Sequence, residues 1–160
     1  MSRGARIGFA CTMLALTLAS SAGAEPDISR IVVSIPPQKF LAEQIGGDRV
    51  NVHVMLEPGH APETFEPTPR QMTGVAGADY YFSIGVPFEK AWLPEIQQQS
   101  PGLRVIECCE QFEKPAERSA GNADPHIWVS PMRFLRAAEL MRAALTGRDS
   151  ANRRIYDQKY

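Results

Sequence analysis

The stretch IVVSIPPQKFLAEQIGGDRVNVHVMLEPG, residues 31–59, decides the fold of this chain. Its first five residues form a mostly β-branched run closed by two prolines, which predicts a strand buried on both faces. Residues 40–45 carry apolar side chains at helical spacing, and the pair Gly46-Gly47 ends that helix. Residues 50–56 alternate between apolar and polar side chains and then become apolar, so they predict a second strand.

The alternation of strand and helix continues beyond this stretch. Further strands are predicted over residues 78–84 and 103–106, and further helices over residues 70–78, 88–99 and 131–145. Pro94 interrupts the second of these helices and is a potential break in it. Such alternation is typical of a parallel sheet covered by helices. We therefore expect an α/β fold with a parallel four-stranded sheet flanked by helices.

The N-terminus has the three parts of a secretory signal peptide in the required order. Arg3 and Arg6 form a basic head, residues 7–18 are mostly apolar, and Ala22-Gly23-Ala24 provides a cleavage site. The apolar run is too short for a permanent membrane span. A buried N-terminal helix is the alternative. We expect export to remove residues 1–24 and to place the mature chain in the periplasm.

Composition and charge exclude some partners of the mature chain. Loss of residues 1–24 removes two of the 17 basic residues and none of the 18 acidic ones, so an acidic excess results. An acidic excess does not indicate the basic surface that binding to nucleic acid or to an anionic membrane requires. No second apolar run approaches the length of a membrane span. The length suits one domain with a core of its own.

Two of the three histidines lie in loops that follow predicted strands. His60 lies in a proline-rich loop over residues 57–69, and His126 lies behind an Asp-Pro turn in residues 121–131. Both loops leave the carboxyl edge of a parallel sheet, where such folds bind ligands. Neutral imidazole is the commonest metal ligand and suits zinc, manganese and iron. From the residues alone, a surface role for His60 and a capping or core role for His126 remain open, and His53 is interpreted as a solvated strand residue.

The cysteines permit an enzymatic alternative. Cys108 and Cys109 are adjacent, so a disulfide between them would be strained and would close almost no loop. We interpret them as one buried and one partly exposed thiol. A thiol- or metal-dependent periplasmic enzyme that uses Cys108, Cys109 or His126 remains the alternative. The sequence contains no serine-hydrolase elbow, zinc-protease pair or phosphate-binding glycine loop.

Together the motifs resemble the solute-binding proteins of zinc and manganese ABC transporters. The segment VVSIPPQKFLAEQIGGDRVNVHVMLEPG resembles that family's opening strand, helix and second strand, and GADYYFSIGVPFEKAWLPEI resembles its third strand and the following helix. APETFEPTPRQM and DPHIWVSP resemble its two ligand loops, and DSANRRIYDQKY resembles the start of a long helix that links two lobes. The combination of Asp-Pro-His-Ile-Trp and Phe-Glu-Pro-Thr-Pro on one exported chain makes the resemblance fairly specific.

The resemblance implies a metal site with ligands from both loops. In such proteins the His of Asp-Pro-His binds metal, which assigns His126 here. The family's first histidine directly follows a proline, a place that Glu63 holds in this chain, while His60 lies three residues earlier. His60 could take over the role, Glu63 could supply a harder oxygen ligand, or the site could be weakened; we favour His60. The bound species would be a divalent metal, zinc in preference to manganese, with no organic cofactor.

The resemblance also implies an architecture and a role. Residues 25–147 would form the N-terminal lobe of a two-lobed protein, and residues 148–160 would begin the inter-lobe helix, truncated before the second lobe. Such a protein binds metal in the periplasm, delivers it to a membrane permease of an ABC transporter and has no catalytic step. A non-functional truncated remnant is a further alternative.

Overall fold

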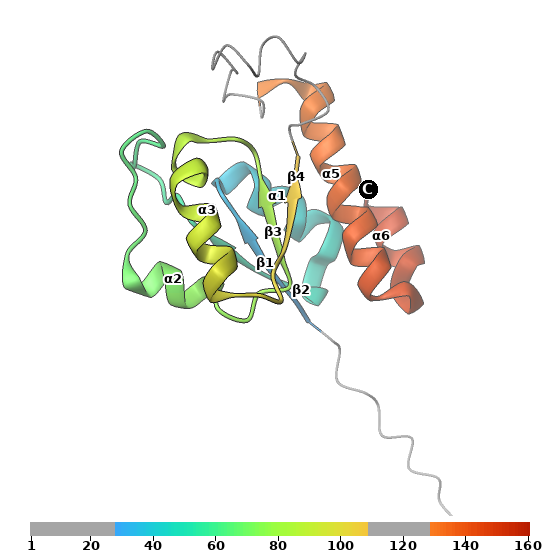
Figure 1. The fold of residues 1–160 in the computed structure, drawn as a ribbon. Coiled ribbons are helices and arrows are strands. Elements are labelled where there is room, and N and C mark those ends of the chain that lie inside the picture. Colours follow the sequence, from blue (N-terminus) through green and yellow to red (C-terminus); the bar gives the residue numbers. More distant parts are fainter. Residues whose placement is uncertain (1–27, 109–128) are drawn as a thin grey trace, which may run out of the picture.

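The structure, a computed structural model, describes residues 28–108 and 129–160. Within these residues, four parallel strands form one sheet in the order β2-β1-β3-β4 (Figure 1). Their bounds are β1 Ser29–Val33, β2 Val50–Val54, β3 Tyr80–Ser83 and β4 Arg104–Glu107. The α/β fold and the four strands expected from the sequence are thereby confirmed.

Helices cover both faces of the sheet. α2 and α3 lie on one face, whereas α1, α5 and α6 pack together on the other (Figure 1). Their bounds are α1 Pro36–Gly46, α2 Pro69–Val75, α3 Pro87–Gln99, α5 Pro131–Arg148 and α6 Arg153–Lys159, with short 3-10 helices at Gly47–Arg49 and Ser150–Asn152. In the part of the chain that the structure describes, no helix combines the length and apolar character needed to cross a membrane.

Pro94 lies inside α3 and does not end it, so the break that the sequence suggested does not occur. A proline in a helix removes one backbone hydrogen bond and normally kinks or breaks the helix. Phe88 before it and Ile96 after it are both buried. Because both halves of α3 are packed into the core, burial of these side chains offsets the lost hydrogen bond.

β1 lies at the centre of the core. Ile31, Val32 and Val33 are at most 1% exposed, because β2 and β3 flank this strand and helices cover both faces. Each such side chain stabilises the fold by about 1.5–3 kcal/mol relative to leaving it in water. The prediction of a strand buried on both faces is confirmed.

Asp149 holds the corner between α5 and α6. Its carboxylate accepts hydrogen bonds at 2.8 Å from the hydroxyl of Tyr156 and from the side-chain amide of Asn152. It also lies 3.8 Å from the guanidinium of Arg49 in the 3-10 helix that follows α1. Burial opposes the ionisation of Asp149, but these hydrogen bonds and the nearby charge lower its pKa. The corner is therefore fixed by a carboxylate that three side chains contact.

Candidate metal site

The segments that follow the strands start at one edge of the sheet. The strands run upward in Figure 1, so the loop after β2, the turn after β3 and Cys108 after β4 all begin at its upper edge. The loop over residues 57–68 thus leaves the carboxyl end of β2, where the sequence predicts it. His126 lies outside the described residues, so its proximity to this loop stays a prediction.

His60 is exposed on this loop and contacts its own neighbours. Its Nδ1 lies 3.4 Å from the carbonyl oxygen of Glu57, and its ring meets the ring of Phe65 edge-on, with the centroids 5.9 Å apart. His60 also lines an open hollow of about 890 Å³ between the loop and α2, together with residues such as His53 and Arg70. The imidazole is therefore placed beside α2.

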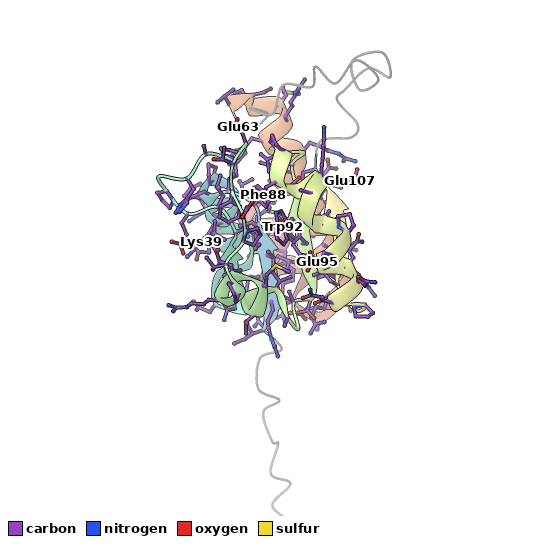
Figure 2. All side chains as sticks on the ribbon, turned by 60° about the vertical axis from the view of Figure 1, so that its left-hand side comes forward. Lys39, Glu63, Phe88, Trp92, Glu95 and Glu107 are labelled. Carbon is purple, nitrogen blue, oxygen red and sulfur yellow. The ribbon has the colours of Figure 1, made fainter. Side chains whose placement is uncertain are left out.

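Glu63 occupies a different part of the same loop. It is exposed and does not line the hollow that His60 lines. Figure 2 labels Glu63 at the upper end of the molecule, level with the first turn of α5. The strands terminate at this end, so Glu63 lies at the same end of the molecule as the carboxyl edge of the sheet.

His53 is half-buried on β2, which corrects its interpretation as a solvated strand residue. Its ring packs against Gly74 of α2, and its buried Nε2 has no hydrogen-bond partner among the residues that the structure describes. Burial lowers the pKa of His53, and the backbone carbonyl of Gln71 and the charge of Glu57 oppose that shift. The residues at 28–108 and 129–160 contain no group of three or more His, Cys, Asp or Glu side chains arranged to hold a metal ion.

A buried carboxylate at the carboxyl edge was missed by the sequence analysis. Glu89, only 4% exposed, accepts hydrogen bonds from the backbone N–H of Ile84 at 3.0 Å and of Gly85 at 2.6 Å. The hydroxyl of Ser34 donates to the same carboxylate and lies 3.0 Å from the hydroxyl of Tyr81. Burial raises the pKa of Glu89, and these hydrogen bonds oppose the shift. A glutamate at the third position of a helix was the available signal for such a contact.

Cys108 is a poor candidate for a nucleophile. Its side chain is 2% exposed, and it directly follows β4. The pKa of the Cys108 thiol is raised to about 12. Burial is the larger cause, and the negative charge of Glu89 is the smaller one. The thiolate is the reactive form of cysteine, so this thiol is inert near neutral pH. The expected buried thiol is confirmed for Cys108, and Cys109 lies outside the described residues.

A comparison with protein families now places the chain. The family model of ZnuA, described as zinc-uptake complex component A, periplasmic, matches residues 31–160. The chain belongs to this family. The match begins in β1 and spans both the loop that carries His60 and Glu63 and the segment that carries His126. The resemblance inferred from the sequence motifs is thereby confirmed.

This ZnuA-family chain is also similar to individual proteins whose names are consistent with the family assignment. It is 29% identical over 128 residues to the manganese-binding lipoprotein MntA of Halalkalibacterium halodurans, covering 79% of this chain and 42% of MntA. It is 31% identical over 109 residues to a putative metal-binding protein of Chlamydia trachomatis, covering 64% of this chain and 37% of that protein. A crystal structure of ZnuA matches with a TM-score of 0.74 and 36% identity, over 83% of this chain and 52% of the other. The chain spans about half the length of the relatives it matches.

Proposed function

We propose that this chain binds a divalent transition metal in the periplasm as part of the solute-binding component of an ABC uptake transporter. The observation that carries the proposal is the family match over residues 31–160, which spans both loops that the sequence assigns to metal binding. Relatives are named as manganese-binding and as metal ABC transporter substrate-binding lipoproteins. The proposed role is binding and delivery to a membrane permease, with no catalytic step.

We propose His126 and Glu63 as the ligands that the two loops supply, with His60 as the alternative in the first loop. The place of Glu63 at the end of the molecule where the strands terminate supports its choice. His60, which the sequence favoured, lies beside α2 and against Phe65. A site with two or three protein ligands would be completed by water or by groups from elsewhere, since closed zinc sites use four.

Zinc is the proposed metal, and manganese is the second candidate. Imidazole suits zinc, whereas a carboxylate also suits manganese. A ZnuA deletion mutant that is 35% identical to this chain has a crystal structure described with zinc bound. MntA, at 29% identity, is named for manganese. Binding of both metals at one mixed imidazole and carboxylate site is the expected behaviour.

The proposed organisation follows the family resemblance. Residues 1–24 would act as a leader that export removes, and residues 25–147 would form one lobe. Residues 148–160 would begin the helix that links this lobe to a second one. The corner held by Asp149 supports this organisation, because it fixes the direction in which α6 leaves α5.

Calorimetric titration of the full chain with zinc and with manganese tests the proposal. We expect saturable binding that His126→Ala abolishes and Glu63→Ala weakens. Glu66→Ala is the matched control, because Glu66 is an exposed carboxylate on the same loop and it lines the hollow beside α2. If His60→Ala weakens binding and Glu63→Ala does not, His60 is the first-loop ligand. Absence of saturable binding with both metals would contradict the proposed function.

A further inference from the structure

The loop that carries His60 and Glu63 has a single buried anchor. Among residues 57–68, Phe65 alone is buried, at 7% exposed. Between residues 57 and 67, the backbone hydrogen bonds to other described residues are long turn contacts: the N–H of His60 donates to Glu57 and the N–H of Thr64 to Ala61, both at 3.3 Å. The last residue of the loop, Thr68, caps α2, and its N–H donates to the side chain of Gln71 at 2.9 Å. The place of the loop over the edge of the sheet therefore depends on what Phe65 contacts.

Phe65 packs against Phe88 in the first turn of α3. The two rings meet edge to face, with the centroids 5.0 Å apart and the planes at 72°. Phe88 is 3% exposed, and Figure 2 labels it in the interior, below Glu63. Edge-to-face contact is the arrangement that aromatic quadrupoles favour, so the pair fixes orientation as well as distance. The first ligand loop is thus joined to α3 through one aromatic contact.

The turn that presents Phe88 is itself fixed by Glu89. The Glu89 carboxylate accepts hydrogen bonds from the N–H groups of Ile84 and Gly85, and from the hydroxyl of Ser34 at the end of β1. Gly85 has a φ of 82°, a left-handed conformation that glycine adopts without strain. A buried carboxylate therefore holds the β3–α3 turn in one shape and sets the place of the ring beside it.

We infer that Phe88, held by Glu89, is a positioning residue for metal binding: its contact with Phe65 sets where the loop delivers Glu63 at the carboxyl edge of the sheet. The inference rests on the proposed function, but it assigns no ligand role to either ring. A loop ordered before the metal arrives loses less conformational freedom on binding. Removal of groups that orient metal ligands typically lowers metal affinity about 10–100-fold.

The test compares Phe65→Ala, Phe88→Ala and the double variant with Ile96→Ala in the full chain. Ile96 is the matched control, because it is a 1% exposed side chain about two turns further along α3. The dissociation constant for zinc should rise about 10–100-fold in both single variants. It should rise no further in the double variant and stay unchanged in Ile96→Ala. Phe65→Leu, which keeps most of the apolar volume, should restore part of the affinity.

A second readout separates this inference from the proposed function. Backbone hydrogen exchange over residues 57–68 in the metal-free chain should be faster in Phe65→Ala and Phe88→Ala, and unchanged in Ile96→Ala. The inference would be overturned if exchange is unchanged in Phe88→Ala, or if it is accelerated equally in Ile96→Ala. It would also be overturned if the affinity losses of the two single variants are fully additive in the double variant. If exchange responds as expected but the unmodified chain binds neither zinc nor manganese, the proposed function fails, and the metal-binding part of the inference fails with it.

Discussion

The imidazole of His53 lies directly against Gly74: a β-carbon added at residue 74 would stand 2.7 Å from two atoms of the ring. The histidine comes from β2, at the edge of the described sheet, and the glycine comes from the short helix α2. The absence of a side chain at residue 74 is what allows α2 to approach the strand. His53 and Gly74 both line the hollow that the loop over residues 57–68 borders.

Replacement of Gly74 by alanine should destabilise the protein. Alanine in place of a helical glycine normally stabilises by about 0.5–1 kcal/mol. Here the ring of His53 would have to move, and overpacking of this kind costs about 1–3 kcal/mol. Gly147→Ala is the control, because Gly147 also lies in a helix, and apart from the backbone of that helix no described residue lies within 4 Å of its added β-carbon. Urea unfolding measures the free energy of unfolding of both variants. If Gly74→Ala is more stable than the unmodified protein, the contact between His53 and Gly74 is loose.

The histidine of this contact should make stability depend on pH. Burial lowers the pKa of His53 below its ordinary value of 6.5, although the Gln71 carbonyl and the charge of Glu57 oppose the shift. Below pH 6.5 the unfolded chain takes up a proton at His53 that the folded chain resists. The free energy of unfolding therefore falls as the pH drops from 6.5 towards the lowered pKa, and above 6.5 this contribution is constant.

Comparison with His53→Gln isolates that contribution. Glutamine does not titrate, and groups that do not interact with His53 contribute equally to both proteins. The difference in unfolding free energy, unmodified protein minus variant, should decline with falling pH below 6.5 and be level above it. A difference that is independent of pH would mean that His53 is protonated as easily in the folded chain as in the unfolded chain.

The sequence predicts the strands and helices of this protein well because their signals are local. The run at residues 31–35 carries its own β-branched pattern, and glycine or proline marks most element ends. His53 was misinterpreted because strand alternation assigns it to a face, while only the tertiary fold shows that α2 crosses that face. Glu89 was missed for the same reason, since its donor Ser34 lies 55 positions away in the chain.

The residues of the candidate metal site stay a prediction. The sequence locates His60 and Glu63 on a loop at the carboxyl edge of the sheet, since a strand followed by a proline-rich turn is a local signal. The sequence favours His60 over Glu63, and that choice stays a prediction, because the places of both residues depend on the contact of Phe65 with Phe88. The convergence of this loop with His126 stays a prediction.

Replacement of Glu89 by glutamine should destabilise the protein although it preserves the shape of the side chain. Both carboxylate oxygens of Glu89 accept backbone hydrogen bonds, one from Ile84 and the other from Gly85. The N–H of Ile84 also reaches the second oxygen, at 3.2 Å, so one glutamine oxygen could accept from both N–H groups. The glutamine NH₂ group would still stand where an acceptor now lies 3.0 Å from the N–H of Ile84, and loss of that bond costs about 1–3 kcal/mol. Glu95→Gln, an exposed change on the same helix, should shift the urea midpoint little. Equal midpoints for the two variants would contradict this account of the turn.

Cys108 should not react with thiol reagents in the folded protein. Its side chain is 2% exposed, and burial together with the charge of Glu89 raises the pKa of the thiol to about 12. The attacking species is the thiolate, which is scarce at neutral pH, and the reagent has little access to the sulfur. In a chain that lacks residues 1–24 and carries Cys109→Ser, Cys108 is the remaining cysteine. An Ellman assay should then show no reaction in buffer and one reactive thiol per chain in denaturant. Rapid reaction of the folded protein would contradict the burial of this thiol and would revive the thiol-dependent enzyme as a competing function.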